Sequence, residues 1–204
     1  MGNKKRRLSR RSDGPRDGFV KGILDFLAQI PVTRERNSDN PLERARSIAR
    51  TAAVNAAVVS GTLSLPLGPA GWLTILPDLM AVWKIQAQMT ADIAGAFGKQ
   101  AYLTREQMLY CLFRHAGAQA VRDLVIRVGE RMLVRRVSGR TLETVVSKVG
   151  VRLTQRIIGR GVSRWLPVVG ALGVAGYAYY DTGQVAHTAI ELFRREVEVE
   201  AGPA

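Results

Sequence analysis

The chain has 204 residues, of which 47% are hydrophobic, so it is long and apolar enough to bury the core of one domain. Its formal net charge of +13 indicates an anionic partner but does not choose between nucleic acid, anionic lipid and an acidic protein. The single cysteine, Cys111, excludes a disulfide or a cysteine-rich metal site within one chain. No sustained alternation of apolar and polar residues is bounded by hairpin turns, which predicts an all-α fold.

Residues 1–18 are predicted to form a disordered basic arm. Its clustered cations are Lys4, Lys5, Arg6, Arg7, Arg10 and Arg11. Residues 19–30 follow as an amphipathic helix that ends before Pro31. Lys21 and Asp25 within this segment argue against an export signal. Residues 31–40 are predicted to be a linker.

One all-α domain is predicted over residues 41–200, with a short tail over 201–204. Asn40, Pro41 and Glu43 form a helix-start pattern, and the alanines that follow allow close helix packing until about Ser60–Gly61. A second helix is expected to start near Pro77–Asp78 and to end at Gly98.

A further helix start is predicted at Thr104, where Gln107 completes a capping box. Helical periodicity then continues to about Arg164. Breaks are expected near Gly117 and at Ser138–Gly139.

Two uncharged apolar stretches, Thr51–Pro77 and Trp165–Tyr180, raise the question of a membrane span. Glycines and prolines interrupt both, and a broken backbone would leave amide and carbonyl groups unpaired in lipid. The stretches are therefore predicted to form Gly/Pro-broken helical hairpins at the centre of a bundle. In the first hairpin one arm ends near Gly61, the tip covers residues 63–76 and the second arm starts at Pro77. Shallow insertion into lipid is the alternative.

Several short motifs within and between these stretches occur in a characteristic order. They are Ser60-Gly61-Thr62, Pro66-Leu67-Gly68-Pro69-Ala70-Gly71, Leu76-Pro77-Asp78-Leu79, Ala94 with Phe97-Gly98, and Leu166-Pro167-Val168-Val169-Gly170-Ala171. Their order and spacing resemble the EcsC family of bacterial proteins over roughly residues 45–195. The resemblance implies a helical fold and supplies no catalytic residue. It also implies a polar or basic continuation after the last motif, where this chain has Tyr177, Tyr179 and Tyr180 instead.

Cations recur at four-residue spacing in two rows of the predicted helical region. The rows are Arg127, Arg131 and Arg135, then Lys148, Arg152, Arg156 and Arg160. Basic residues beside an apolar helix face suit an anionic membrane surface, because their aliphatic stems lie on lipid while their heads meet phosphates. The alternative is a solvated face on which some arginines pair with the acidic tail residues Glu191, Glu196, Glu198 and Glu200.

The arm and the helix after it together predict a reversible membrane anchor. Each cation near an anionic leaflet contributes about 1 kcal/mol, and Phe19, Ile23 and Leu27 would supply the hydrophobic contact. The alternative is a disordered arm plus a helix packed on the domain.

Catalytic motifs are absent from the sequence, so no catalytic residue, cofactor or metal site is predicted. No glycine-rich loop cradles phosphate, and His115 and His187 form no convincing metal site with the scattered carboxylates. Cys111 and His115 lie one helical turn apart, and a buried, inert thiol is the favoured interpretation. Asp181, an acidic residue in apolar surroundings, is the one carboxylate singled out for testing.

The sequence thus predicts a non-enzymatic, cytoplasmic protein that binds peripherally to the anionic cytoplasmic face of a bacterial membrane. A soluble helical scaffold that recruits an acidic protein or nucleic acid is the first alternative. An enzyme with an unrecognised site is the second.

Overall fold

The computed structural model describes residues 15–63, 75–121, 124–128, 131–159 and 167–200. These ranges are mostly helical, which confirms the all-α prediction. The helices are α1 (Pro15–Ala28), α2 (Pro41–Leu63), α3 (Ile75–Ala96), the short 3₁₀ helix η1 (Gln100–Tyr102), α4 (Arg105–Val121), α5 (Gly139–Gly159) and α6 (Pro167–Arg194). The strands are β1 (Val125–Val128), β2 (Arg131–Arg135) and β3 (Glu196–Glu200).

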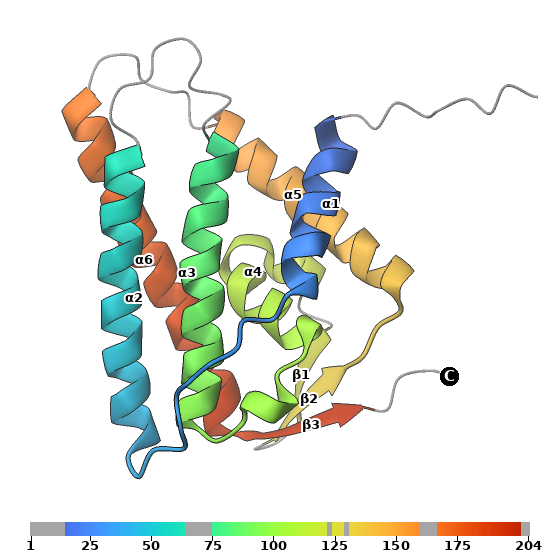
Figure 1. The fold of residues 1–204 in the computed structure, drawn as a ribbon. Coiled ribbons are helices and arrows are strands. Elements are labelled where there is room, and N and C mark those ends of the chain that lie inside the picture. The colour runs from blue at the N-terminus through green and yellow to red at the C-terminus, as the bar shows by residue number, and fades with distance from the viewer. Residues whose placement is uncertain (1–14, 64–74, 122–123, 129–130, 160–166, 201–204) are drawn as a thin grey trace, which may run out of the picture.

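The helices form a bundle with a small sheet at one end (Figure 1). Helices α2 and α3 lie side by side and run in opposite directions, and α6 packs along both. Helix α4 lies behind α3 in this view, and α5 covers α1 and α4. The largest fully buried side chains include Phe113 of α4 and Phe193 of α6, which places the core where these layers meet.

Small side chains line the buried faces of α2 and α6. On α2 these residues are Ala45, Ala52, Ala53 and Ala56, and on α6 they are Ala178, Ala186 and Ala189. Because the distance between packed helices depends on the side chains at the contact, alanines let the two axes approach closely. The close packing expected from the alanines of the first predicted helix is therefore present.

Helix caps confirm two predicted starts, and a third cap lies at the break predicted at Ser138–Gly139. The Glu43 amide donates to Asn40 Oδ1 over 3.4 Å at the start of α2, while Asn40 Nδ2 donates to Glu43 Oε2 over 2.8 Å. The Thr104 and Gln107 pair forms the expected reciprocal box before α4, with bonds of 3.3 and 3.0 Å. The Thr141 amide donates to Ser138 Oγ over 3.3 Å before α5.

The prediction of a helix between Gly117 and Ser138 is wrong. Helix α4 continues through Gly117 to Val121, and an antiparallel β1–β2 hairpin follows, to which β3 adds in parallel. Met132 and Val134 point into the core while Arg131 and Arg135 are exposed, so β2 alternates as a strand does. Five residues were too short a run to show this period in the sequence.

Two other boundaries differ from the predictions. Helix α1 starts at Pro15, inside the segment expected to be a disordered arm, because proline suits the first helical position. Helix α3 starts at Ile75. The helices α2 and α3 are the two arms expected of the first hairpin, whereas most of its tip, residues 64–74, lies outside the described residues. In the described ranges, no helix is both long and apolar enough to cross a membrane.

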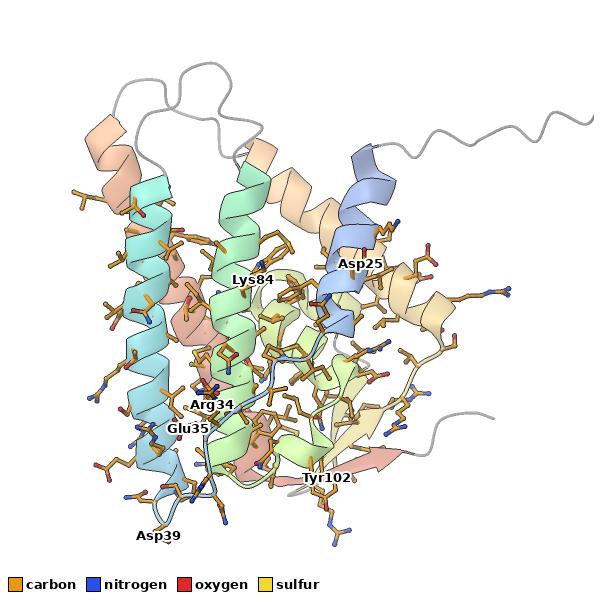
Figure 2. All side chains as sticks on the ribbon, viewed as in Figure 1. Asp25, Arg34, Glu35, Asp39, Lys84 and Tyr102 are labelled. Carbon is orange, nitrogen blue, oxygen red and sulfur yellow. The ribbon has the colours of Figure 1, made fainter. Side chains whose placement is uncertain are left out.

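The segment predicted as a linker, residues 31–40, lies along α3. Thr33 Oγ1 donates to Asp92 Oδ1 over 2.6 Å, and the Ser38 amide donates to the Ala96 carbonyl over 3.0 Å. Figure 2 shows Glu35 on this segment as it runs past α3 towards the start of α2. A Cβ added at Gly95 of α3 would lie 3.0 Å from both the Cβ and the carbonyl oxygen of Glu35, so the contact requires glycine.

The Gly95→Ala variant is expected to lower the free energy of unfolding by about 1 kcal/mol, because the added methyl group pushes the 31–40 segment off α3. Gly176→Ala is the matched control in α6, where the added Cβ meets nothing within 4 Å. This control is expected to raise the free energy of unfolding by up to about 1 kcal/mol, because alanine has a higher helix propensity than glycine. Urea unfolding measures both, and equal stabilisation by both substitutions would contradict the packing of the segment on α3.

Candidate functional site

A buried polar cluster joins three helices at the centre of the bundle. Asp181 of α6 accepts from Gln86 Nε2 of α3 through Oδ2 over 2.9 Å. Its Oδ1 lies 2.6 Å from His115 Nε2 of α4. Gln86 Nε2 also donates to Thr182 Oγ1 over 3.2 Å. Asp181, the carboxylate singled out in the sequence, thus meets partners 66 and 95 residues away.

The cluster is largely removed from solvent. The side chains of Asp181 and His115 are 16% and 18% exposed, and Gln86 is fully buried. Among the described residues, Gln86 Oε1 and His115 Nδ1 have no hydrogen-bond partner. Two buried polar atoms of the cluster therefore lack a hydrogen bond. This lowers the stability of the fold unless the surrounding contacts compensate.

The charge of Asp181 is stabilised by its neighbours. Burial raises the pKa of its carboxyl, but the hydrogen bond and charge of His115 lower it, as do hydrogen bonds from Gln86 and Tyr177. The balance leaves the pKa of Asp181 below its ordinary value. At neutral pH the carboxylate is ionised and orients the imidazole.

In covalent catalysis, a carboxylate that orients an imidazole activates a neighbouring nucleophile. Cys111 lies one turn before His115 on α4 and is fully buried, and burial raises the pKa of its thiol. A thiol held in its neutral form is a poor nucleophile. The arrangement therefore fits a polar contact that aligns α3, α4 and α6.

The structure corrects the membrane-facing role predicted for Ile23 and Leu27. Both side chains are 1% exposed and belong to the main core, so α1 turns its apolar face towards the domain. The side chain of Phe19 is not among those described, and the arm cations Lys4, Lys5, Arg6, Arg7, Arg10 and Arg11 lie outside the described residues.

The first predicted arginine row does not form a helix face. Arg127 lies on β1, while Arg131 and Arg135 lie on β2, opposite Glu196 and Glu200 of β3. Opposite charges at paired positions of neighbouring strands favour the sheet. The acidic tail expected to pair with arginines is thus brought beside them by strand register.

Lys148, Arg152 and Arg156 of the second row lie on α5, as predicted, and Lys148 is exposed. The apolar face next to this row is not available to lipid, because Val146 and Val149 are fully buried in the core. The side chains of Arg152 and Arg156 are not described, and Arg160 lies outside the described residues.

A basic groove that the sequence analysis missed lies between α2 and α6. Its volume is about 560 Å³, and it is lined by α2 from Leu42 to Ala53 and by α6 from Tyr179 onwards. We call it the α2–α6 groove. Its cationic and titratable lining consists of Arg46, Arg50, His187, Glu191, Arg194 and Arg195, with Tyr179 at one end.

Exposed apolar side chains lie on the other halves of the same two helices. They are Val54 (52% exposed), Val58 (58%), Leu172 (70%), Tyr179 (49%) and Tyr180 (63%). We call these five residues, with the exposed Arg46, Arg50, His187 and Arg194, the α2–α6 face. Helices α2 and α6 run in opposite directions (Figure 1), so the apolar ends lie together and the basic ends lie together.

A pattern in the sequence indicates the part of this face that lies on α2. Arg46, Arg50, Val54 and Val58 follow one another at four-residue spacing, which is a single ridge along a helix. The ridge changes from basic to apolar at its middle. Its partner on α6 is more than 100 residues away, and the sequence alone did not reveal that pairing.

A metal site finds no candidate in the described part of the chain. No group of three or more His, Cys, Asp or Glu side chains there is arranged to hold a metal ion. Glu191, the carboxylate in the lining of the α2–α6 groove, accepts a hydrogen bond from Arg114 Nη1 over 2.7 Å. This hydrogen bond lowers the pKa of Glu191.

Comparison of the chain with protein-family models, with curated proteins and with solved structures gave no match. The resemblance to the EcsC family consequently stays a prediction from the sequence.

The Asp181→Asn variant is expected to lower the free energy of unfolding by about 1–3 kcal/mol near neutral pH, because His115 and Gln86 lose a charged acceptor. The native pKa of Asp181 lies below the unfolded value of about 3.9, so this stabilisation is complete above the unfolded pKa. It disappears as the pH falls through the native pKa. Urea unfolding at a series of pH values should therefore show the difference between wild type and variant shrinking in acid.

Asp39→Asn serves as the control for this experiment, because Asp39 is an exposed carboxylate on the 31–40 segment. It is expected to change the free energy of unfolding by less than about 0.5 kcal/mol at every pH. An Asp181→Asn variant as stable as this control would contradict the central role of the cluster.

Proposed function

We propose that this protein binds peripherally to an anionic membrane surface through the α2–α6 face. The observation that carries the proposal is the division of this face into an apolar, aromatic end and an arginine-rich end. The proposed binding surface differs from the one predicted from the sequence. Helices α1 and α5, which were expected to face the membrane, turn their apolar sides towards the core.

The apolar end is suited to shallow insertion. Val54 and Val58 lie one turn apart on α2, and Leu172 and Tyr180 lie two turns apart on α6. Each of the four is more than half exposed. Exposed apolar side chains on neighbouring helices favour a site of interaction, and tyrosine suits the interface between headgroups and acyl chains.

The basic end supplies attraction to the headgroups. Arg46 and Arg50 project from α2, and Arg194 ends α6, all exposed. Arginines near an anionic leaflet contribute about 1 kcal/mol each, and their aliphatic stems tolerate the apolar boundary. The helix rise places Arg46 about 18 Å from Val58 along α2, so the basic and the apolar signals occupy different halves of the helix.

The basic arm adds a second electrostatic contact in this proposal. Its six clustered cations and the net charge of +13 favour the anionic cytoplasmic leaflet of a bacterial membrane. The arm needs no apolar partner in α1, because the α2–α6 face supplies the hydrophobic contact. The proposed work is binding or assembly at the membrane, without catalysis.

Flotation of the full chain with phosphatidylcholine vesicles and with vesicles containing phosphatidylglycerol tests the proposal. The wild type is expected to float only with the anionic vesicles, and its binding should weaken as salt is raised. The Val58→Asn, Leu172→Asn double variant is expected to bind about tenfold more weakly, because two apolar contacts with lipid are lost.

Val32→Asn is the control, since Val32 is 88% exposed on the 31–40 segment, outside the α2–α6 face. It is expected to bind as the wild type does. Equal losses in the control and the double variant would contradict the assignment to this face. Retention of the chain on DNA or RNA, with no binding to anionic vesicles, would instead favour nucleic acid.

A further inference from the structure

We propose that the α2–α6 groove is a binding site for a phosphate monoester, presented as the headgroup of an anionic phospholipid. This inference rests on the proposed function and names the chemical group that the basic end of the α2–α6 face recognises. It is carried by the convergence of arginines from two antiparallel helices on one concave surface.

The groove brings cations together from opposite ends of the chain. Arg46 and Arg50 lie one turn apart near the start of α2, and Arg194 and Arg195 lie at the end of α6. His187 contributes an imidazole two turns before Arg194. Arginine presents planar, paired N–H donors that match the oxygens of a phosphate, so several such side chains around one hollow select this group.

Three arginines that line the groove are not paired with a carboxylate side chain that the structure describes. Glu191 is engaged by Arg114, which reaches it from α4. Glu43 belongs to the helix cap with Asn40. Arg46, Arg50 and Arg194 line the groove and form no ion pair with any side chain that the structure describes, so no described carboxylate neutralises their charge there.

The helix ends also favour an anion here. The start of α2 lies at this end of the pair, and a helix N-terminus carries partial positive charge. The end of α6 carries the opposite partial charge, but Lys99 covers it. Lys99 Nζ donates to the Phe193 carbonyl over 2.8 Å and also bonds the Arg195 carbonyl. The negative end of α6 is thereby neutralised beside the site.

The size and the walls of the groove fit a lipid headgroup. A volume of about 560 Å³ lies within the range of roughly 300–1,000 Å³ for ligand pockets. Tyr179, Ala53 and Ile190 line the groove among its cations. Tyr179 also belongs to the apolar end of the α2–α6 face, so a phosphate among the arginines would place its acyl chains towards the residues proposed to insert.

A phosphate monoester matches this site better than a diester because of its charge. A monoester carries about −1.5 to −2 charges at pH 7 and offers three acceptor oxygens. A phosphodiester headgroup carries a single negative charge. Two or more guanidinium groups therefore gain more from the monoester, and the groove should discriminate between lipids that a flat basic patch would bind alike.

The test compares vesicles of phosphatidylcholine containing phosphatidic acid with vesicles containing phosphatidylglycerol, at equal total surface charge. The full wild-type chain is expected to bind the phosphatidic acid vesicles about tenfold more tightly. The Arg46→Gln, Arg194→Gln double variant is expected to lose this preference and to bind both vesicles alike. Arg36→Gln, Arg140→Gln removes the same charge from exposed arginines outside the groove, and this control should keep the preference.

Three additions keep the test decisive. The Arg46→Lys, Arg50→Lys variant retains the charge but removes the paired donors, so a reduced preference for phosphatidic acid supports recognition of the phosphate group. Thermal unfolding shows whether each variant is folded. Titration with inorganic phosphate, followed by NMR, reports whether the groove binds the group without a lipid.

The failures of the two proposals are distinguishable. Equal binding to both anionic vesicles overturns the phosphate monoester site and leaves the proposed function standing. Binding of inorganic phosphate with no binding to any vesicle overturns the lipid source and the proposed function together. If neither phosphate nor vesicles bind, both proposals are wrong.

Discussion

A carboxylate at the centre of a helical bundle must find partners, and Asp181 finds them on two other helices. Its bonds to His115 and Gln86 fix where α6 lies along α4 and α3, because a hydrogen bond tolerates little displacement. Thr182 accepts a second bond from the same glutamine and tightens this register. The inner side of α6 is thereby held in place, and its outer side is presented beside α2. The alignment of the basic and apolar ends of the α2–α6 face follows from contacts buried behind it.

The inward and outward sides of helix α2 have different roles. Its inward alanines bring it close to α6 and α3, whereas its outward ridge carries Arg46, Arg50, Val54 and Val58. The short distance between the axes is what allows arginines from two helices to share one groove. Larger inward side chains would separate the helices and leave two unrelated basic ridges. Packing inside the bundle and charge on its surface are therefore properties of the same helix pair.

The sequence predicted those features whose causes lie within a few residues. The caps at Asn40 and Thr104 each depend on residues three positions apart, and both helices start where expected, while α5 starts at the break predicted at Ser138–Gly139. The β1–β2 hairpin was missed because its strands are short and its third strand comes from residues 196–200. The amphipathic pattern of α1 identified an apolar face correctly but could not show that this face meets the core. The chemistry of Asp181 could be noticed in the sequence, whereas its partners, being far away in the chain, could not.

The separation of α2 and α6 along the chain has a consequence for how the molecule is assembled. Helices α2 and α3 are neighbours in sequence and can pair as soon as both are made, but the alanine face of α2 then lacks its second partner. That partner begins at Pro167, after α4, the hairpin and α5 have been synthesised. Closing such a long loop is slow compared with forming local helix pairs. Helix α6, which leaves the ribosome after α5, therefore completes the core of the first hairpin, and folding of this core waits for it.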